Sequence, residues 1–355
     1  MRTEVTPMPC RLAMALAFLA LPAAASAATP EPGPLAIKVI ETVLLPRYDA
    51  LASTTATQAS DWRKACADGD AANDATALRD DFQKASDAWS SVEFFTTGPV
   101  SVSLRPDRLF FAPDRRNTVA KALSELVAKA KDGEVPAETV RSISVAAQGF
   151  PALERVLYEP GEGDAAARCR AGLAIADNLS HIAADIATEW RSVEGPLAKL
   201  KAGKGDPVHF ADPAQAAARL MTDLAGGVQR INDLKLLPVL GADVDAARPK
   251  AAEGWRSGRS ARAIRITTAS LVETAKVFSG AAPADVAAAS AKDFAAAQAA
   301  VGKLPDDLGQ AAADPKRRKT LDGAVAALKL AQRDLAGNLA PALGIPLGFN
   351  ALDGD

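Results

Sequence analysis

The sequence predicts an all-α protein of two antiparallel helical bundles, and three observations lead to that fold class. Apolar residues recur at spacings of three and four along most of the 355 residues, which is the period of a helix with one buried face. Alternation of the kind found in strands is confined to Val100 to Leu104, which is too short to build a sheet. Alanine is abundant and aromatic residues make up 5% of the chain, as expected for closely packed helices.

The N-terminal residues have the pattern of an export signal. Arg2 and Arg11 precede an apolar run, Leu12 to Leu21, and a small-residue cleavage pattern follows at Ala25 to Ala27. We expect residues 1–27 to be removed and the mature protein to be periplasmic. The apolar run is too short to span a bilayer and no later segment is apolar enough, so no transmembrane anchor is expected. The net charge of −2 gives no reason to expect nucleic acid as a partner.

The first bundle is expected over residues 35–200. Its helices follow apolar stripes and are predicted at Leu35 to Ala65 with a kink at Pro46, at about 71 to 95, at Thr118 to Lys131, from Pro136 through an interruption at Gly149, and from an Asp164 cap to Arg191. The helical pattern stops between Thr96 and Asn117. This segment carries four arginines beside two phenylalanines, and long loops in compact domains are often functional.

The stretch from Gly195 to Asp212 is rich in glycine, proline and lysine, and it is the expected boundary between the bundles. Asp212 followed by Pro213 is a helix-start signal, because a capping side chain precedes a proline. The second bundle is expected over residues 210–355, with helices from Asp212 to about Leu236, Ala261 to Phe278, Pro283 to Val301 and Pro315 to Leu339.

The stretch from Val145 to Tyr158 is the most informative in the chain. Gly149 and Pro151 interrupt what is otherwise continuous helix. Glu154 lies on or beside an apolar face formed by Phe150, Leu153 and Leu157. A carboxylate there needs a partner, because burying it unpaired costs several kcal/mol, and arginines from the long loop are the expected partners.

In this stretch the chain resembles the imelysins, secreted or envelope-bound bacterial proteins that are also classed as insulin-cleaving peptidases. Their hallmark is Gly-x-His-x-x-Glu in a helical context. Gly149 and Glu154 match that motif, while Pro151 stands where the family has histidine.

The resemblance extends over most of the mature chain. Further stretches that are similar to the family lie in the same order, at Trp89 to Glu93, Thr97 to Pro99, Phe111 to Asn117, Arg168-Cys169, Asn178, Trp255 to Ser260 and Gly348 to Asp355. The resemblance implies two bundle-like domains with shared polar residues meeting between them. It also implies an envelope role often linked to iron uptake, with other iron-uptake proteins of the envelope as partners.

The departure at Pro151 argues against metallopeptidase chemistry. His-x-x-Glu puts two metal ligands on one helix face, whereas proline offers no lone pair. The two histidines of the chain, His181 and His209, have no second histidine at ligand spacing, and a helix-surface or loop position is the expected role of each. A carboxylate-only site for iron or another divalent metal remains open, with Glu93 and Glu154 as its ligands.

Several residues are candidates for binding a ligand, and each also has a plain structural interpretation. Arginines of the long loop can grip a carboxylate, phosphate or sugar acid through forked hydrogen bonds, or can be solvated surface charges. Polar groups at a helix start form a natural anion site, or serve only as caps. The candidate set is Trp89, Glu93, Arg105, Arg115, Glu154, Arg256, Ser257 and Ser260.

Removal of the export signal leaves two cysteines, Cys66 and Cys169. In an oxidising compartment such a pair is expected to form a disulfide, and two buried thiols are the alternative.

Three functions follow from these observations. The first is a non-catalytic exported protein that binds a metal, a metal complex or a small anionic ligand between its two helical domains, in iron uptake. The second is a peptidase that uses Glu154 without the motif histidine. The third is a structural or partner-binding envelope protein, in which the interdomain polar residues only fix geometry.

Overall fold

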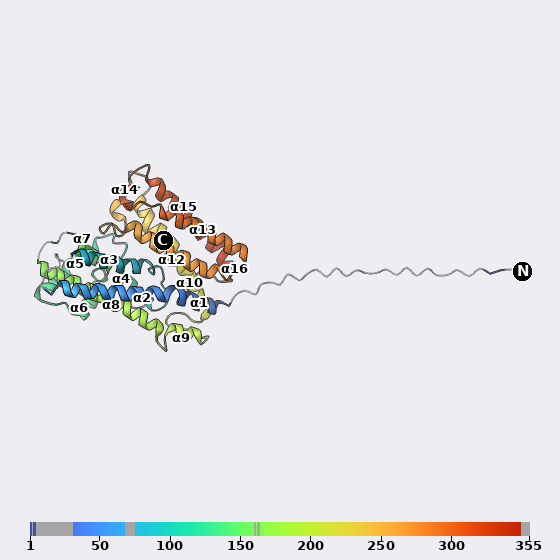
Figure 1. Cartoon of the computed structure of the whole chain (residues 1–355), viewed down its shortest axis with the longest axis horizontal. Coiled ribbons are helices and arrows are strands. Elements are labelled where there is room, and N and C mark those ends of the chain that lie inside the picture. The colour runs from blue at the N-terminus through green and yellow to red at the C-terminus, as the bar shows by residue number, and fades with distance from the viewer. Residues whose placement is uncertain (2, 5–30, 68–74, 160, 162–163, 349–355) are drawn as a thin grey trace.

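The computed structural model describes residues 1, 3–4, 31–67, 75–159, 161 and 164–348. Almost all of the expected export signal and the terminal residues 349–355 lie outside the described residues. The described chain is all-α, as predicted: its only strand-like pairing is an isolated bridge between Asp206 and Phe210. Figure 1 shows two groups of helices side by side, the N-terminal group in blue to green and the C-terminal group in yellow to red.

The N-terminal group is built around a long antiparallel pair, α2 and α8, with α3 packed on α2. Its α-helices are α2 (Leu45–Ala65), α3 (Ala75–Ser90), α4 (Arg105–Leu109), α5 (Thr118–Lys129), α6 (Ala137–Ser142), α7 (Phe150–Tyr158) and α8 (Ala165–Arg191). The Asp164 side chain accepts a hydrogen bond from the Ala166 N–H at 2.9 Å, so the predicted cap of α8 is confirmed. The short helix α4 lies inside the segment where the sequence predicted no helix.

The C-terminal group is a bundle in which α13 packs against both α12 and α15. Its α-helices are α10 (Pro213–Arg230), α11 (Leu237–Leu240), α12 (Ser260–Ser279), α13 (Ala284–Gly302), α14 (Leu308–Ala312), α15 (Arg318–Asp334) and α16 (Ala340–Ala342). The Asp212 carboxylate accepts a hydrogen bond from the Gln215 N–H at 2.7 Å, which confirms the predicted start of α10. A further short helix, α9 (Pro196–Lys201), occupies part of the expected boundary stretch.

The first helix of the chain joins the two groups. α1 (Pro32–Val39) continues through a π-helical turn (Ile40–Leu44) into α2. α2 packs in the N-terminal group, but α1 packs against α10 and α12 of the C-terminal group, as Figure 1 also shows. One helical rod therefore contacts both halves of the molecule, even though its residues come from the first half of the sequence.

In the part of the chain that the structure describes, three π-helical turns each lie directly before a proline near the start of the next helix. They are Ile40–Leu44 before Pro46, Ile231–Leu236 before Pro238, and Leu335–Leu339 before Pro341. Proline cannot donate to the carbonyl four residues earlier and its ring crowds that carbonyl, so a wider turn relieves the conflict. The predicted kink at Pro46 therefore takes the form of a π turn within a continuous helix.

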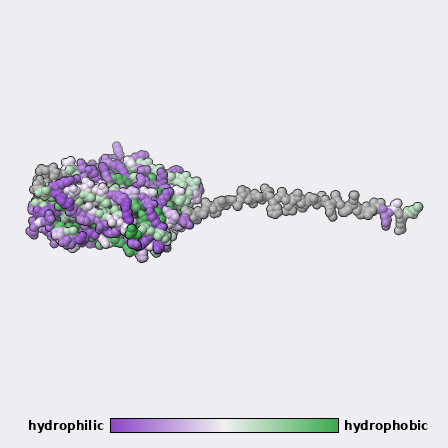
Figure 2. Space-filling view, turned by 60° about the horizontal axis from the view of Figure 1, so that its bottom comes forward, coloured by the Kyte–Doolittle hydropathy of each residue, from purple (hydrophilic) through white to green (hydrophobic). Residues whose placement is uncertain are grey.

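Cys66 and Cys169 form a disulfide that ties the end of α2 to the start of α8, with their Cα atoms 5.6 Å apart. None of the described helices combines the length and apolarity needed to cross a bilayer. On the face shown in Figure 2, hydrophilic residues are mixed with small apolar patches.

Candidate functional site

The motif stretch forms the start of α7, and its glycine is required by space. Gly149 is the N-cap residue in an ordinary extended conformation. A Cβ atom at this position would lie 2.3 Å from the Leu109 carbonyl oxygen and 2.6 Å from that of Arg108. Pro151 occupies the second position of the helix, where its missing N–H breaks no intrahelical hydrogen bond. The glycine therefore lets α7 begin against the backbone of α4.

Glu154 is buried on α7, and its partner comes from the C-terminal half of the chain. The Ser257 N–H and hydroxyl donate to Glu154 Oε1 at 3.0 and 2.5 Å. Ser257 lies in a turn flanked by Gly254 and Gly258, both with positive φ, 67° and 68°, which glycine adopts without strain. The partner is therefore a serine of this turn and not an arginine of the long loop.

We call the contact of α3 and α7 with residues 253–262 the seam. Beside Glu154, Arg256 forms an ion pair with Glu159 and stacks on the Trp255 ring, with its guanidinium carbon 4.5 Å from the ring centroid. Arg155 holds the same Glu159 carboxylate at 2.8 Å. Burial alone would raise the pKa of Glu159, but hydrogen bonds from Arg256 and Arg155 lower it below its usual range.

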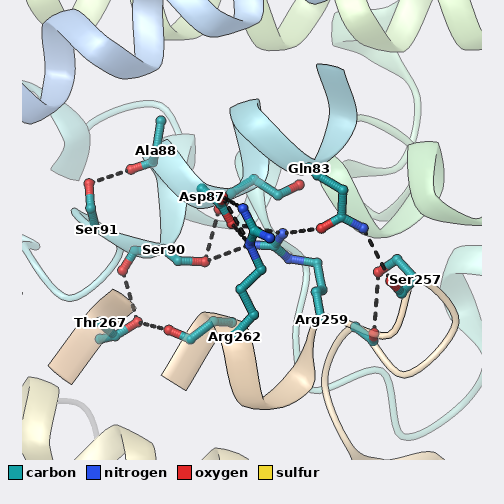
Figure 3. A network of polar contacts seen from close by, with 12 residues as sticks. Gln83, Asp87, Ala88, Ser90, Ser91, Ser257, Arg259, Arg262 and Thr267 are labelled. Carbon is teal, nitrogen blue, oxygen red and sulfur yellow. Dashed lines mark hydrogen bonds and ion pairs between the residues drawn. The ribbon is translucent and has the colours of Figure 1, made fainter. Parts of the chain in front are cut away.

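Arg259 is the most connected residue of the seam, as Figure 3 shows. Its guanidinium donates to Gln83 at 2.9 Å, to Asp87 at 3.2 Å and to the Ser90 hydroxyl at 3.0 Å, all on α3. Arg262, one turn further along α12, also binds Asp87, with its Nε 2.9 Å from Oδ1. Burial lowers the pKa of Arg259, and Asp87 offsets part of that cost. These hydrogen bonds and ion pairs hold the start of α12 against α3.

A second buried cluster surrounds Glu93, directly after α3. Lys235, in the π turn before α11, donates to Glu93 at 2.5 Å and to Glu253 at 2.7 Å. Thr267 of α12 adds a hydrogen bond to Glu93 at 2.8 Å. Burial alone would lower the pKa of Lys235. The two carboxylates together outweigh burial and raise the pKa above its usual value, so the ammonium form is favoured. Burial also raises the pKa of Glu253.

A third contact between the halves involves Asp223 of α10. Its carboxylate accepts hydrogen bonds from the Thr96 hydroxyl at 2.5 Å and from the Thr97 N–H at 3.1 Å. Burial raises the pKa of Asp223 to about 6 despite these hydrogen bonds. The buried Tyr48 hydroxyl has no hydrogen-bond partner among the described residues, and its pKa is raised by burial and then by Asp223.

The predicted site residues divide among different surroundings. Glu154, Arg256 and Ser257 meet at the seam, whereas Glu93 belongs to the Lys235 cluster. Trp89 is buried on α3 with its indole N–H unpartnered within the described chain, and Ser260 is buried at the first position of α12. Arg105 pairs with Glu189 of α8, and Arg115 is exposed on the loop. Lys235 and Arg259 were not among the predicted site residues, because their partners lie far away in the chain.

Glu93 and Glu154 therefore each have protein partners of their own. Across the described residues no group of three or more His, Cys, Asp or Glu side chains is arranged to hold a metal ion. The predicted carboxylate pair would bind a metal only if Lys235 and Ser257 gave way, so this metal site stays a prediction.

Two cavities accompany these residues. One of about 10 Å³ lies at the seam, where Pro151, Glu154, Glu253 and Arg259 contribute to its wall. It has room for about one water molecule. The other, of about 230 Å³, lies within the N-terminal group and is lined by Arg105, Arg108 and His181 among others.

Comparison with known proteins agrees with this architecture. The chain is similar in fold to an imelysin-like protein from Psychrobacter arcticum 273-4, with a TM-score of 0.74 and 22% identity over 91% of this chain and 100% of that one. It is also similar to a protein from Parabacteroides distasonis ATCC 8503 named as an iron-regulated protein A precursor, with a TM-score of 0.71 and 15% identity over 87% of this chain and 95% of that one. No curated protein matches the chain. The sequence model of the imelysin family matches residues 44–335, and the chain therefore belongs to the imelysin family.

Proposed function

We propose that this chain is an exported imelysin-family protein that binds a ligand at the seam and does not hydrolyse peptides. The observation that carries the proposal is the pairing of Pro151 and Glu154, three residues apart on α7, which both line the seam cavity. Glu154 offers a carboxylate for recognition. Pro151 offers no lone pair, so the two side chains cannot act together as metal ligands.

The proposed ligand is a metal, a metal complex or a small anion that reaches Glu154 when the turn 254–258 moves. In its present position this turn covers Glu154, and the hydrogen bonds of Ser257 to the carboxylate hold it there. Gly254 and Gly258 flank the turn, and glycines absorb backbone rotations at low cost. Glu253 and Arg259 line the same cavity and would then be the next groups to meet the ligand.

A link to iron supply is part of the proposal. One structure of similar fold is named as an iron-regulated protein, and this chain belongs to the imelysin family. These two observations support the link. We propose that the mature protein acts in the periplasm together with other iron-uptake proteins of the envelope.

A structural role is the second candidate, and the balance of charge at the seam favours it. Each charged group described there already has an oppositely charged or hydrogen-bonding partner: Glu154 with Ser257, Arg256 with Glu159, and Arg259 with Asp87. Such a network holds two helix groups in one orientation without any ligand.

Two measurements on the mature chain and on matched variants distinguish these functions. They are metal binding and the cleavage of a protein substrate. The chain from Ala28, purified without a His tag, is titrated with iron, zinc, manganese and calcium and incubated with a fluorescent protein substrate. Glu154→Gln keeps the shape of the side chain and removes its charge. Pro151→His restores the motif imidazole beside Glu154.

A saturable metal that is lost in Glu154→Gln, with no turnover, supports the proposal. Turnover of the unaltered chain that disappears in Glu154→Gln identifies a peptidase instead. A loss of thermal stability in Glu154→Gln, with neither ligand nor turnover in any variant, leaves the structural role. Turnover that appears only in Pro151→His would show directly that the proline removes a catalytic ligand.

A further inference from the structure

The larger of these two cavities, of about 230 Å³, lies between α4, α6 and α8 in the N-terminal group, and its lining shares no residue with that of the seam cavity. α4 contributes Arg105 and Arg108, α6 contributes Arg141, and α8 contributes His181 and Asp185. Its volume is below that of pockets for drug-sized ligands, so it suits a small molecule.

Arg108 is a guanidinium that forms no ion pair within the described chain. Its Nε donates to Gln148 Oε1 at 2.8 Å and its Nη2 to Asn178 Oδ1 at 3.0 Å, and both acceptors are neutral amides. No carboxylate of the described chain forms an ion pair with it. Burial lowers the pKa of Arg108, the neighbouring Arg105 and Arg141 lower it further, and Asp185 offsets only part of this shift. Three of its five N–H groups have no described protein partner and are left for a ligand or solvent.

Buried neighbours hold Arg108 in place. Gln148 donates through Nε2 to the Ile143 carbonyl at 2.9 Å, and Asn178 donates through Nδ2 to the Gln148 carbonyl at 2.9 Å. Gln148 and Asn178 are 1% and 7% exposed, so their amide oxygens stay directed at the guanidinium. An arginine fixed in this way loses little conformational freedom when an anion binds.

The other charges around the pocket leave an excess of about one positive charge. Arg105 forms a forked ion pair with Glu189 and lies 3.7 Å from Asp185. Asp177 is paired with Arg63 at 2.7 Å. Counting the lining side chains and their ion-pair partners, four guanidinium groups stand against three carboxylates. This excess matches a ligand with one negative charge.

The remaining polar groups indicate what else such a ligand carries. His181 Nδ1 donates to the Asp177 carbonyl at 2.7 Å, so Nε2 is the ring nitrogen that is left for a ligand. The Asp185 carboxylate is also an acceptor on the wall. A hydroxyl group of the ligand can form a hydrogen bond with either side chain, because it both donates and accepts. A doubly charged phosphate would instead bring a second negative charge towards Asp185.

We propose that this pocket binds a small monoanionic carboxylate that bears hydroxyl groups, such as a sugar acid. Its carboxylate pairs with Arg108 and with Arg141 at the entrance, and its hydroxyl groups form hydrogen bonds with His181 and Asp185. Charge-assisted hydrogen bonds to a fixed guanidinium supply most of the affinity. The site is separate from Glu154 and does not depend on the proposed function of the seam.

Calorimetric titration of the mature chain with D-glucuronate, acetate and inorganic phosphate at low ionic strength tests this proposal. Glucuronate is expected to bind saturably and more tightly than the other two. Arg141→Ala is the main variant, because Arg141 is exposed and makes no described side-chain contact that folding requires. It is expected to weaken glucuronate binding at least about fivefold, and Arg108→Gln about tenfold or more. Arg116→Ala, an exposed arginine outside the pocket, is the matched control and is expected to leave the affinity unchanged.

Three results would overturn the proposal. The site is refuted if none of the three anions binds at millimolar concentration, or if Arg116→Ala weakens binding as much as Arg141→Ala. Phosphate that binds as tightly as glucuronate and is equally sensitive to Arg141→Ala refutes the carboxylate and leaves a general oxyanion site. The seam proposal is tested by titrating Glu154→Gln with metals, which is a separate experiment. The failure of one proposal therefore leaves the other standing.

Discussion

Asp223 makes a quantitative prediction about how stability depends on pH. Its pKa is about 6 in the folded chain, against a usual value of 3.8. Between these values the folded chain keeps a proton that the unfolded chain releases, so the free energy of unfolding falls as pH rises. The contribution is fully present below about pH 4 and is lost above about pH 6. A shift of about two pKa units corresponds to about 3 kcal/mol.

Asp223→Asn isolates this contribution. Asparagine resembles protonated aspartate, and its amide oxygen can still accept from the Thr97 N–H. We expect Asp223→Asn to gain about 3 kcal/mol relative to the unaltered chain between pH 4 and pH 7. Urea unfolding of both proteins across that range gives this double difference, in which the other titrating groups cancel.

Asp314 provides a control with the opposite sign. It is partly exposed, and hydrogen bonds from the Arg317 and Lys316 N–H groups lower its pKa. Asp314→Asn should therefore lose stability relative to the unaltered chain as pH rises through the acid range. The argument from burial would be refuted if the stability difference between Asp223→Asn and the unaltered chain did not change with pH. It would also be refuted if that difference changed in the same direction as for Asp314→Asn.

Three further perturbations test the buried contacts by urea unfolding. Lys235→Met leaves two carboxylates buried without their cation and should cost about 3–5 kcal/mol, and a cost below about 1 kcal/mol would mean that the cluster is hydrated. Gly149→Ala pushes a methyl group into two carbonyl oxygens and should cost about 1–3 kcal/mol, whereas Gly323→Ala, which meets no neighbour and has no positive φ, is the control for an added methyl group without a clash. Replacing Cys66 and Cys169 together by serine should cost about 2–5 kcal/mol, and an unchanged midpoint would show that the bridge adds nothing to stability.

Local patterns predicted the helices well, because the signals lie within a few residues of one another. The caps at Asp164 and Asp212 and the long apolar stripes correspond to helix starts and buried faces in the structure. Short helices such as α4 were missed, because five residues cannot show a helical period. The π turns were also missed, since the visible signal was only a proline, for which a kink is the usual expectation.

The partners of the site residues were much harder to predict. Glu154 was expected to meet an arginine of the long loop, yet it binds Ser257, which lies 103 residues away in the sequence. Lys235 reads as one polar residue in an apolar run, and nothing nearby in the sequence indicates two buried carboxylates. Such contacts depend on how distant helices pack, and a single sequence carries no direct signal for that packing.

The rod formed by α1 and α2 has a consequence for attempts to divide the molecule. Its first turns lie against α10 and α12, and its remainder is held to α8 by packing and by the disulfide. A protease that cuts the exposed stretch at 202–204 would break the connection along the chain but leave this rod intact across both halves. The nicked protein should therefore migrate as one particle on a sizing column, and separately expressed halves divided at that stretch would deprive the C-terminal helices of a neighbour that they contact in the whole chain.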